Sequence, residues 1–305
     1  MSDPLLLSAP KGKCRAEFSQ ALELIIVKYS GQAIAFLTQH GKEALLGSLF
    51  SEKLACTLVR ATGFDTDQLG TFTRDVPRPG TQLAAARFKA TKGMELTGLS
   101  MGIGSEGAFG ADPVGGIMPW NTEVIVWVDA TLGIEIVGIA QGSGGGLQRF
   151  IHTEDELRQF ADDANFPSHG LVLRPDREDD PRILKGFTDW PALLAGFNEL
   201  SAQSAKARIF TEVDQRAHMN PSRQRMIIQA AEDLIAKIAS TCPSCDTPGF
   251  WLKERVSGLP CGLCHQPTRL PLAFIWRCDV CTHAEERREP PDKTADPSRC
   301  DYCNP

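Results

Sequence analysis

The pattern of apolar and polar positions between residues 18 and 240 predicts an α/β domain. Residues 32–38 are a mostly apolar run of strand length, and residues 44–50 follow with apolar side chains at helical spacing. Residues 81–96 form a predicted helix rich in alanine, which can lie close to a sheet, and residues 99–103 are predicted to be another buried strand. This order of elements predicts a mixed sheet flanked by helices.

The second half of this region continues the alternation of strands and helices. Residues 123–129 and 133–139 alternate around a turn and predict a hairpin. Thr153 and Glu156 have the spacing of a capping box, which begins a helix. A long apolar stripe at helical spacing follows Asn220-Pro221 and leads directly into the cysteine-rich tail, so we expect no flexible linker before that tail.

Four Cys-x2-Cys pairs in the last fifth of the chain hold eight of its ten cysteines. Two intervening residues let both thiolates of a tight turn face one cation, and two such turns complete a tetrahedral four-sulfur shell. Disulfides and an iron–sulfur cluster are the alternatives. We predict a zinc-ribbon domain over residues 241–305 with two structural zinc ions, held by Cys242, Cys245, Cys261, Cys264, Cys278, Cys281, Cys300 and Cys303. Cys14 and Cys56 are predicted to be ordinary thiols.

Three pairings of these four turns are open: neighbours in sequence, an inner pair nested within an outer pair, or an interleaved cross-brace. The thirteen-residue spacer between Cys264 and Cys278 suits a hairpin, which favours nesting. A closed shell of four thiolates has no open coordination position, so we expect both ions to stabilise the tail rather than to meet a substrate.

Composition and charge restrict the classes of function. The net charge of −6 lacks the basic footprint of a nucleic-acid-binding protein, which makes a nucleic-acid partner unfavourable. No apolar run reaches the length of a membrane span, and residues 1–10 lack a secretory pattern. We expect a cytoplasmic protein without a membrane partner, in which residues 1–17 form a loose arm.

Two predicted strand ends carry polar residues of chemical interest. His40 and Lys42 lie in a turn between a strand and a helix, where backbone N–H groups and a lysine favour an anion; the alternative is an exposed, solvated turn. Glu106 lies among small residues after a buried strand, where it could hold Mg²⁺ or act as a base; alternatively it faces water. Asp65 and Asp67 could add ligands to the same Mg²⁺, or form an Asx-turn.

A third polar cluster lies at a predicted strand-to-helix junction between residues 212 and 223. Arg216 and Arg223 would suit phosphate oxygens, and His218 could transfer a proton. A salt-bridge network that satisfies itself is the equally weighted alternative.

Several of these motifs together resemble a bacterial family defined as a domain of unknown function, from about residue 31 onward. They include His40-Gly41-Lys42-Glu43, Ser105-Glu106-Gly107-Ala108-Phe109-Gly110, Arg216-Ala217-His218-Met219-Asn220-Pro221 and Cys300-Asp301-Tyr302-Cys303-Asn304-Pro305. This resemblance implies no activity.

The order of elements around Lys42 and Glu106 is also similar to that of the inosine-triphosphate-pyrophosphatase-like superfamily. There a lysine in a strand-to-helix loop binds the triphosphate, acidic residues hold Mg²⁺, and a basic loop before a late helix completes the site. The resemblance implies these roles for Lys42, for Glu106 and for Arg216 or Arg223, in that order.

Our leading hypothesis is therefore a Mg²⁺-dependent hydrolase of a nucleotide or related phosphorylated small molecule. It requires the side chains of Lys42, Glu106, Arg216 and His218 in one pocket. The alternative is a non-catalytic adaptor whose zinc ribbon docks a protein or nucleic acid. That role requires an exposed patch on the ribbon, for which the candidates are Phe250, Trp251, Phe274 and Trp276.

Overall fold

A computed structural model describes residues 28–39, 41–69, 80–113, 115–144 and 146–305, except the side chains of Asp67 and Leu69. The predicted N-terminal arm, Cys14 and the candidate phosphate-binding residue His40 lie outside the described residues. Within this part of the chain, no helix combines the length and the apolar character that crossing a bilayer requires.

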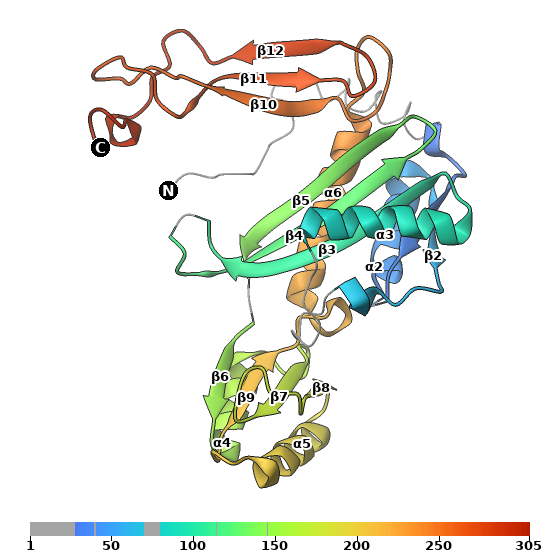
Figure 1. Cartoon of the computed structure of the whole chain (residues 1–305), viewed down its shortest axis with the longest axis vertical. Helices are drawn as coiled ribbons and strands as arrows, with labels where there is room; N and C mark the ends of the chain where they lie inside the picture. Colours follow the sequence, from blue (N-terminus) through green and yellow to red (C-terminus); the bar gives the residue numbers. More distant parts are fainter. Residues whose placement is uncertain (1–27, 40, 70–79, 114, 145) are drawn as a thin grey trace.

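A mixed five-stranded sheet forms the centre of the molecule (Figure 1). Its order is β2-β1-β3-β4-β5; β1 is parallel to β2 and β3, and the remaining pairs are antiparallel. The predicted hairpin is present as β4 and β5. The strands are β1 (Ala33–Leu37), β2 (Thr57–Ala61), β3 (Met101–Ala111), β4 (Pro119–Asp129) and β5 (Ile134–Ser143).

Helices cover both faces of this sheet. Helix α3 (Gln82–Thr97) lies on one face, and α2 (Lys42–Leu54) and α6 (Pro221–Ala239) lie on the other. The main apolar core lies between α2, α6 and the sheet, around Phe50 and Trp127. Glycines allow the close approach on the α3 side: a Cβ at Gly104 would overlap the carbonyl oxygen of Ala86, so α3 packs directly on the backbone of β3.

Residues 148–213 build a second, antiparallel sheet with its own apolar core. Its order is β6-β9-β7-β8, and two helices flank it. The single mixed sheet expected from the sequence is therefore divided in two, because this segment buries its apolar side chains against one another. The elements are β6 (Gln148–Ile151), α4 (Glu154–Asp163), β7 (Leu171–Pro175), β8 (Leu184–Phe187), α5 (Trp190–Gln203) and β9 (Ile209–Val213).

The cysteine-rich sheet follows α6 directly. It consists of β10 (Trp251–Ser257), β11 (Pro271–Arg277) and β12 (Ala284–Arg288), all antiparallel in that order. Helix α6 runs from the four-stranded sheet at its N-terminal end to the cysteine-rich sheet at its C-terminal end (Figure 1).

Candidate functional site

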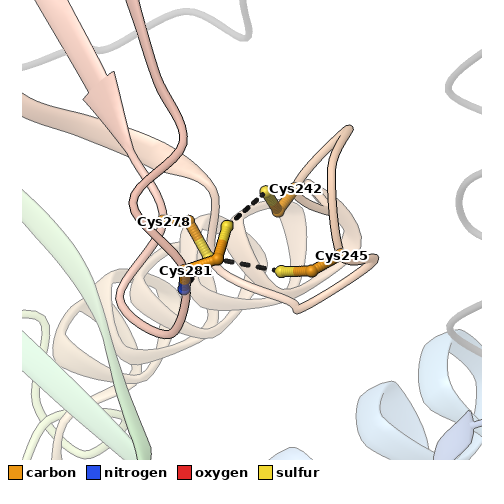
Figure 2. A group of neighbouring side chains, drawn as sticks. All are labelled: Cys242, Cys245, Cys278 and Cys281. Carbon is orange, nitrogen blue, oxygen red and sulfur yellow. Dashed lines mark hydrogen bonds between the residues drawn. The ribbon is translucent and has the colours of Figure 1, made fainter.

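The eight paired cysteines converge into two groups of four. In the first group, Cys242 Sγ lies 3.7 Å from Cys281 Sγ, and Cys245 Sγ lies 3.6 Å from Cys278 Sγ (Figure 2). Four sulfurs about 2.3 Å from a central zinc ion are about 3.8 Å apart when tetrahedral, so this group fits the ion. A disulfide would bring two sulfurs to about 2.05 Å, and all eight thiols are free.

The second group has the same geometry. Cys261 Sγ lies 3.8 Å from Cys303 Sγ, and Cys264 Sγ lies 3.6 Å from Cys300 Sγ. Backbone N–H groups also point at sulfur: Leu263 N–H donates to Cys261 Sγ at 3.4 Å, which favours the thiolate that zinc binds. Each group of four cysteines could therefore hold one zinc ion.

The order of strands explains why the first turn pairs with the third and the second with the fourth. Because β10 and β11 are antiparallel, the turn before β10 meets the turn after β11, where Trp251 lies opposite Arg277. Strand β12 returns the chain to the other end of the sheet, where the last turn meets the one between β10 and β11. The interpretation of nested pairs is therefore wrong, and the tail is a cross-brace with its two sites about 20 Å apart.

The aromatic residues proposed as a docking patch on the ribbon do not form one. Phe250 and Trp251 are buried, and Phe250 packs against Cys242 and Cys278 in the small core of the tail. Phe274 and Trp276 are half-buried neighbours on β11. These side chains stabilise the cysteine-rich sheet instead of presenting an exposed surface.

A layer of buried charged side chains lies between α2, α6 and the five-stranded sheet. Lys42 is 6% exposed and donates to Ser105 Oγ at 3.0 Å, while Arg223 Nε lies 2.7 Å from Glu123 Oε1. The arginine pair needs the absence of a side chain at Gly107, because a Cβ there would overlap both the guanidinium and the carboxylate. Burial makes such groups costly unless they are paired: Arg223 is paired with Glu123, whereas Lys42 is hydrogen-bonded to Ser105.

A cavity of about 390 Å³ lies beside this layer, where the first turn of α6 faces the segment that follows α4. Arg223 and Asn121 line it from the buried layer, and Ser222 and Arg225 line it from the exposed side of the helix. Asn121 is 2% exposed, and its Oδ1 accepts no hydrogen bond from the described residues.

Arg225 contributes a positive charge to the lining of this cavity. Among the described residues its guanidinium forms no ion pair, and it donates to Ser222 Oγ at 3.1 Å. Arg223, by contrast, is neutralised by Glu123. The N-terminal turn of a nineteen-residue helix adds the positive end of its dipole at the same place.

Comparison with known families finds one family model that matches most of the chain. A model described as a domain of unknown function (DUF6671) matches residues 89–305, which is more than two thirds of the chain. The chain belongs to the DUF6671 family. No curated protein and no solved structure matches the chain. The DUF6671 match includes the cysteine-rich sheet, the four-stranded sheet and α6, whereas Lys42 on α2 precedes it.

The four side chains expected in one pocket are separated in this DUF6671 structure. Successive residues of a strand face opposite sides, so Ser105 faces Lys42 while Glu106 faces α3 and pairs with Lys89 at 2.6 Å. Neither Lys42 nor Glu106 lines the cavity. The expected arrangement is corrected accordingly: of the predicted phosphate-binding residues, Arg223 alone reaches the cavity among those described.

The polar residues before α6 form part of a salt-bridge network, which was the alternative to a phosphate site at this junction. Arg216 Nη2 lies 2.6 Å from Asp214 Oδ2, which is fully buried, and His218 is exposed and does not line the cavity. Asn220 caps α6 by accepting the N–H of Arg223, as its position in the sequence predicts.

The predicted magnesium ligands do not form a site in the described part of the chain. Glu106 is paired with Lys89, and Asp65 accepts a hydrogen bond from Gln39 at 2.9 Å. Asp67 has no described side chain. The two cysteine groups are the only clusters of three or more metal-binding side chains among the described residues. Neither Glu106 nor Asp65 therefore belongs to a cluster of metal-binding side chains.

Sequence reasoning did not identify several residues that line the cavity. His169 and Ser222 are 53 positions apart, and no spacing rule connects them. Asn121 lies on an alternating strand, where it would pass for an ordinary polar position. Arg225 stands two residues after Arg223 in the same basic cluster at the start of α6, which was the one available signal.

Lys42 should make the stability of the protein depend on pH. Burial, and then the charge of Arg223, lowers its pKa to about 7 from 10.5. Between these two values the unfolded chain binds more protons than the folded one, so stability rises with pH; below about pH 7 the burial penalty is complete. We expect Lys42→Met to be more stable than the wild type at pH 6, by about 1–2 kcal/mol, with the difference shrinking by pH 10.

Urea unfolding at several pH values measures this effect. Lys53→Met is the matched control, because Lys53 is exposed on the same helix. Parallel pH profiles for the wild type and Lys42→Met would show that Lys42 keeps its ordinary pKa.

Proposed function

We propose that the protein binds a phosphorylated small molecule of the nucleotide class in the cavity at the N-terminus of α6. The observation that carries the proposal is Arg225, a guanidinium without an ion-pair partner among the described residues, in the lining of a cavity of about 390 Å³. Helix N-termini and arginines are the usual donors to phosphate, and the volume suits a nucleotide.

We also propose hydrolysis as the fate of the bound molecule, which is the reaction expected in the leading hypothesis from the sequence. Since the described carboxylates form no cluster of three or more, we propose that Mg²⁺ arrives with the nucleotide, and no step of the protein's own is assigned to it. The two zinc ions are proposed to be structural, because four thiolates close the coordination shell.

Binding of nucleoside triphosphates with Mg²⁺, followed by calorimetry, tests this proposal. Arg225→Gln should raise the dissociation constant about tenfold or more, because it removes a charge-assisted hydrogen bond to phosphate. Arg87→Gln is the control, since Arg87 is exposed on α3 and pairs with Glu135. If no member of the panel binds the wild type, or if Arg225→Gln binds equally well, the proposal fails.

Turnover of the same panel then separates hydrolysis from binding. Glu106→Gln should keep any turnover observed, because Glu106 faces α3 on the other side of the sheet. A large loss of turnover in a variant that is still folded would restore Glu106 to the mechanism.

A further inference from the structure

The cavity contains a serine and a histidine in contact. His169 Nε2 lies 3.0 Å from Ser222 Oγ, and both residues line the cavity. Ser222 is exposed at the second position of α6, and His169 is half-buried in the segment between α4 and β7. A small molecule in the cavity would therefore meet the hydroxyl directly.

The hydrogen bonds around the imidazole decide which nitrogen carries its proton. Ser168 Oγ donates to the carbonyl oxygen of Asn165 at 2.6 Å, since a carbonyl can only accept. The same Oγ lies 3.2 Å from His169 Nδ1 and is left to accept from it. A neutral His169 then holds its proton on Nδ1, so that Nε2 accepts the hydroxyl proton of Ser222.

The surroundings favour a neutral imidazole beside an activated hydroxyl. Burial, followed by the charge of Arg225, lowers the pKa of His169 below its ordinary value of 6.5, although a hydrogen bond to Asn165 opposes the shift. Arg225 Nη2 also donates to Ser222 Oγ at 3.1 Å, and a cation at this distance favours the alkoxide. The first turn of α6 leaves the N–H of Ser222 without a partner inside the helix, which adds a donor for a developing oxyanion.

We propose that Ser222 is the nucleophile, and His169 the general base, of a site that hydrolyses a polar small-molecule carboxylic ester. Ser222 Oγ attacks the carbonyl carbon while its proton passes to His169 Nε2. The bond to the leaving oxygen breaks, and that oxygen takes the proton from the imidazolium. Water then gives a proton to His169, and its oxygen attacks the acyl carbon. The carboxylic acid is released and Ser222 regains its proton.

This activity goes beyond binding of a phosphorylated molecule, and the two can fail separately. Phosphate binding uses Arg225 and the end of the helix, whereas ester hydrolysis requires the Ser222 hydroxyl and His169. Ester hydrolysis should therefore be lost in Ser222→Ala, and calorimetry on the same variant scores nucleotide binding separately. Ser168 is a positioning residue, since it touches His169 rather than the substrate.

Labelling with a fluorophosphonate, located by peptide mass spectrometry, tests the proposal on the whole zinc-loaded protein. We expect modification at Ser222, its loss in Ser222→Ala, and a rate about 100-fold lower in His169→Gln. Ser48→Ala and His152→Gln are the controls, because both residues are exposed and lie outside the cavity. Ser168→Ala should slow labelling several-fold, and Ser168→Thr should restore it by keeping the hydroxyl.

A second measurement is independent of the fluorophosphonate. In Ser222→Cys, His169 should accelerate alkylation of the introduced thiol by iodoacetamide, relative to a double variant that combines Ser222→Cys with His169→Gln. p-Nitrophenyl acetate should be hydrolysed by the wild type and not by Ser222→Ala. Absence of label at Ser222, or labelling that does not depend on His169, would overturn the proposal, provided that the variants melt as the wild type does.

Discussion

Removal of zinc should unfold the cysteine-rich sheet and leave the five-stranded sheet folded. The tail from residue 241 onward has a small apolar core, formed mainly by Phe250 and Trp276 around the first cysteine group. Metal binding supplies about 10–16 kcal/mol to the folding of comparable zinc-finger peptides, which is more than such a core contributes. By contrast, the core around Trp127 and Phe50 does not involve the tail cysteines.

Hydrogen exchange before and after chelation measures this result segment by segment. We expect two zinc ions per chain in the untreated protein and loss of protection in β10–β12 when they are removed. Protection in β3, β4 and α6 should change little. A tail that stays protected without metal would show that the thiolate groups are not needed for folding.

The pairing of the cysteines can be tested by counting zinc in double variants. Cys242 and Cys281 belong to the same group, so the double variant Cys242→Ser, Cys281→Ser should still bind one zinc ion per chain. Either of the other pairings would place these two residues in different sites, and the double variant would then bind none. Cys56→Ser is the control, because Cys56 is buried in the main core and should leave both ions bound.

The sequence was sufficient to identify the eight cysteine ligands of the tail, but it did not show which turns share a zinc site. A Cys-x2-Cys turn is a local structure, so its spacing already identifies all eight residues. Which turns meet depends on the order of β10, β11 and β12 in the sheet, and the charged, half-exposed strand β12 gave no apolar pattern by which to find it.

In the main domain, too, local features were predictable from the sequence, whereas long-range arrangement was not. The cap at Thr153 was predicted and is confirmed, because a side chain that accepts the N–H three residues on is specified locally. The division into two sheets was missed, since it depends on which apolar faces bury one another over long distances.

The predicted pocket around Lys42 and Glu106 failed because the two residues lie on opposite sides of β3. Ser105 and Glu106 are adjacent in sequence, yet they face Lys42 and Lys89 on opposite sides of the sheet. Sequence reasoning favoured Glu106, because a carboxylate can bind a metal or act as a base. The sequence alone does not show which of two adjacent strand residues faces which side of the sheet. Arg223 was found, whereas its partner Glu123 comes from a strand one hundred residues earlier.

That partnership should make Arg223→Met one of the most destabilising substitutions in the molecule. The side chains of Arg223 and Glu123 are 1% and 0% exposed, so removing one leaves the other buried without its opposite charge. We expect a loss of about 3–5 kcal/mol, by urea unfolding, for either Arg223→Met or Glu123→Met. The double variant should lose less than the sum of the two, because it leaves no uncompensated charge.

The double-mutant cycle also separates the pair from the other contacts of Arg223. Its guanidinium donates to the carbonyl oxygen of Gln215, and this bond is lost in both variants that lack the arginine. Lys89 and Glu106 form the comparison pair on the opposite face; they are more exposed, so Lys89→Met should cost less. Additive losses in the Arg223–Glu123 cycle would mean that the two charges do not stabilise each other, and that Arg223 is held in place chiefly by Gln215 and the turn before α6.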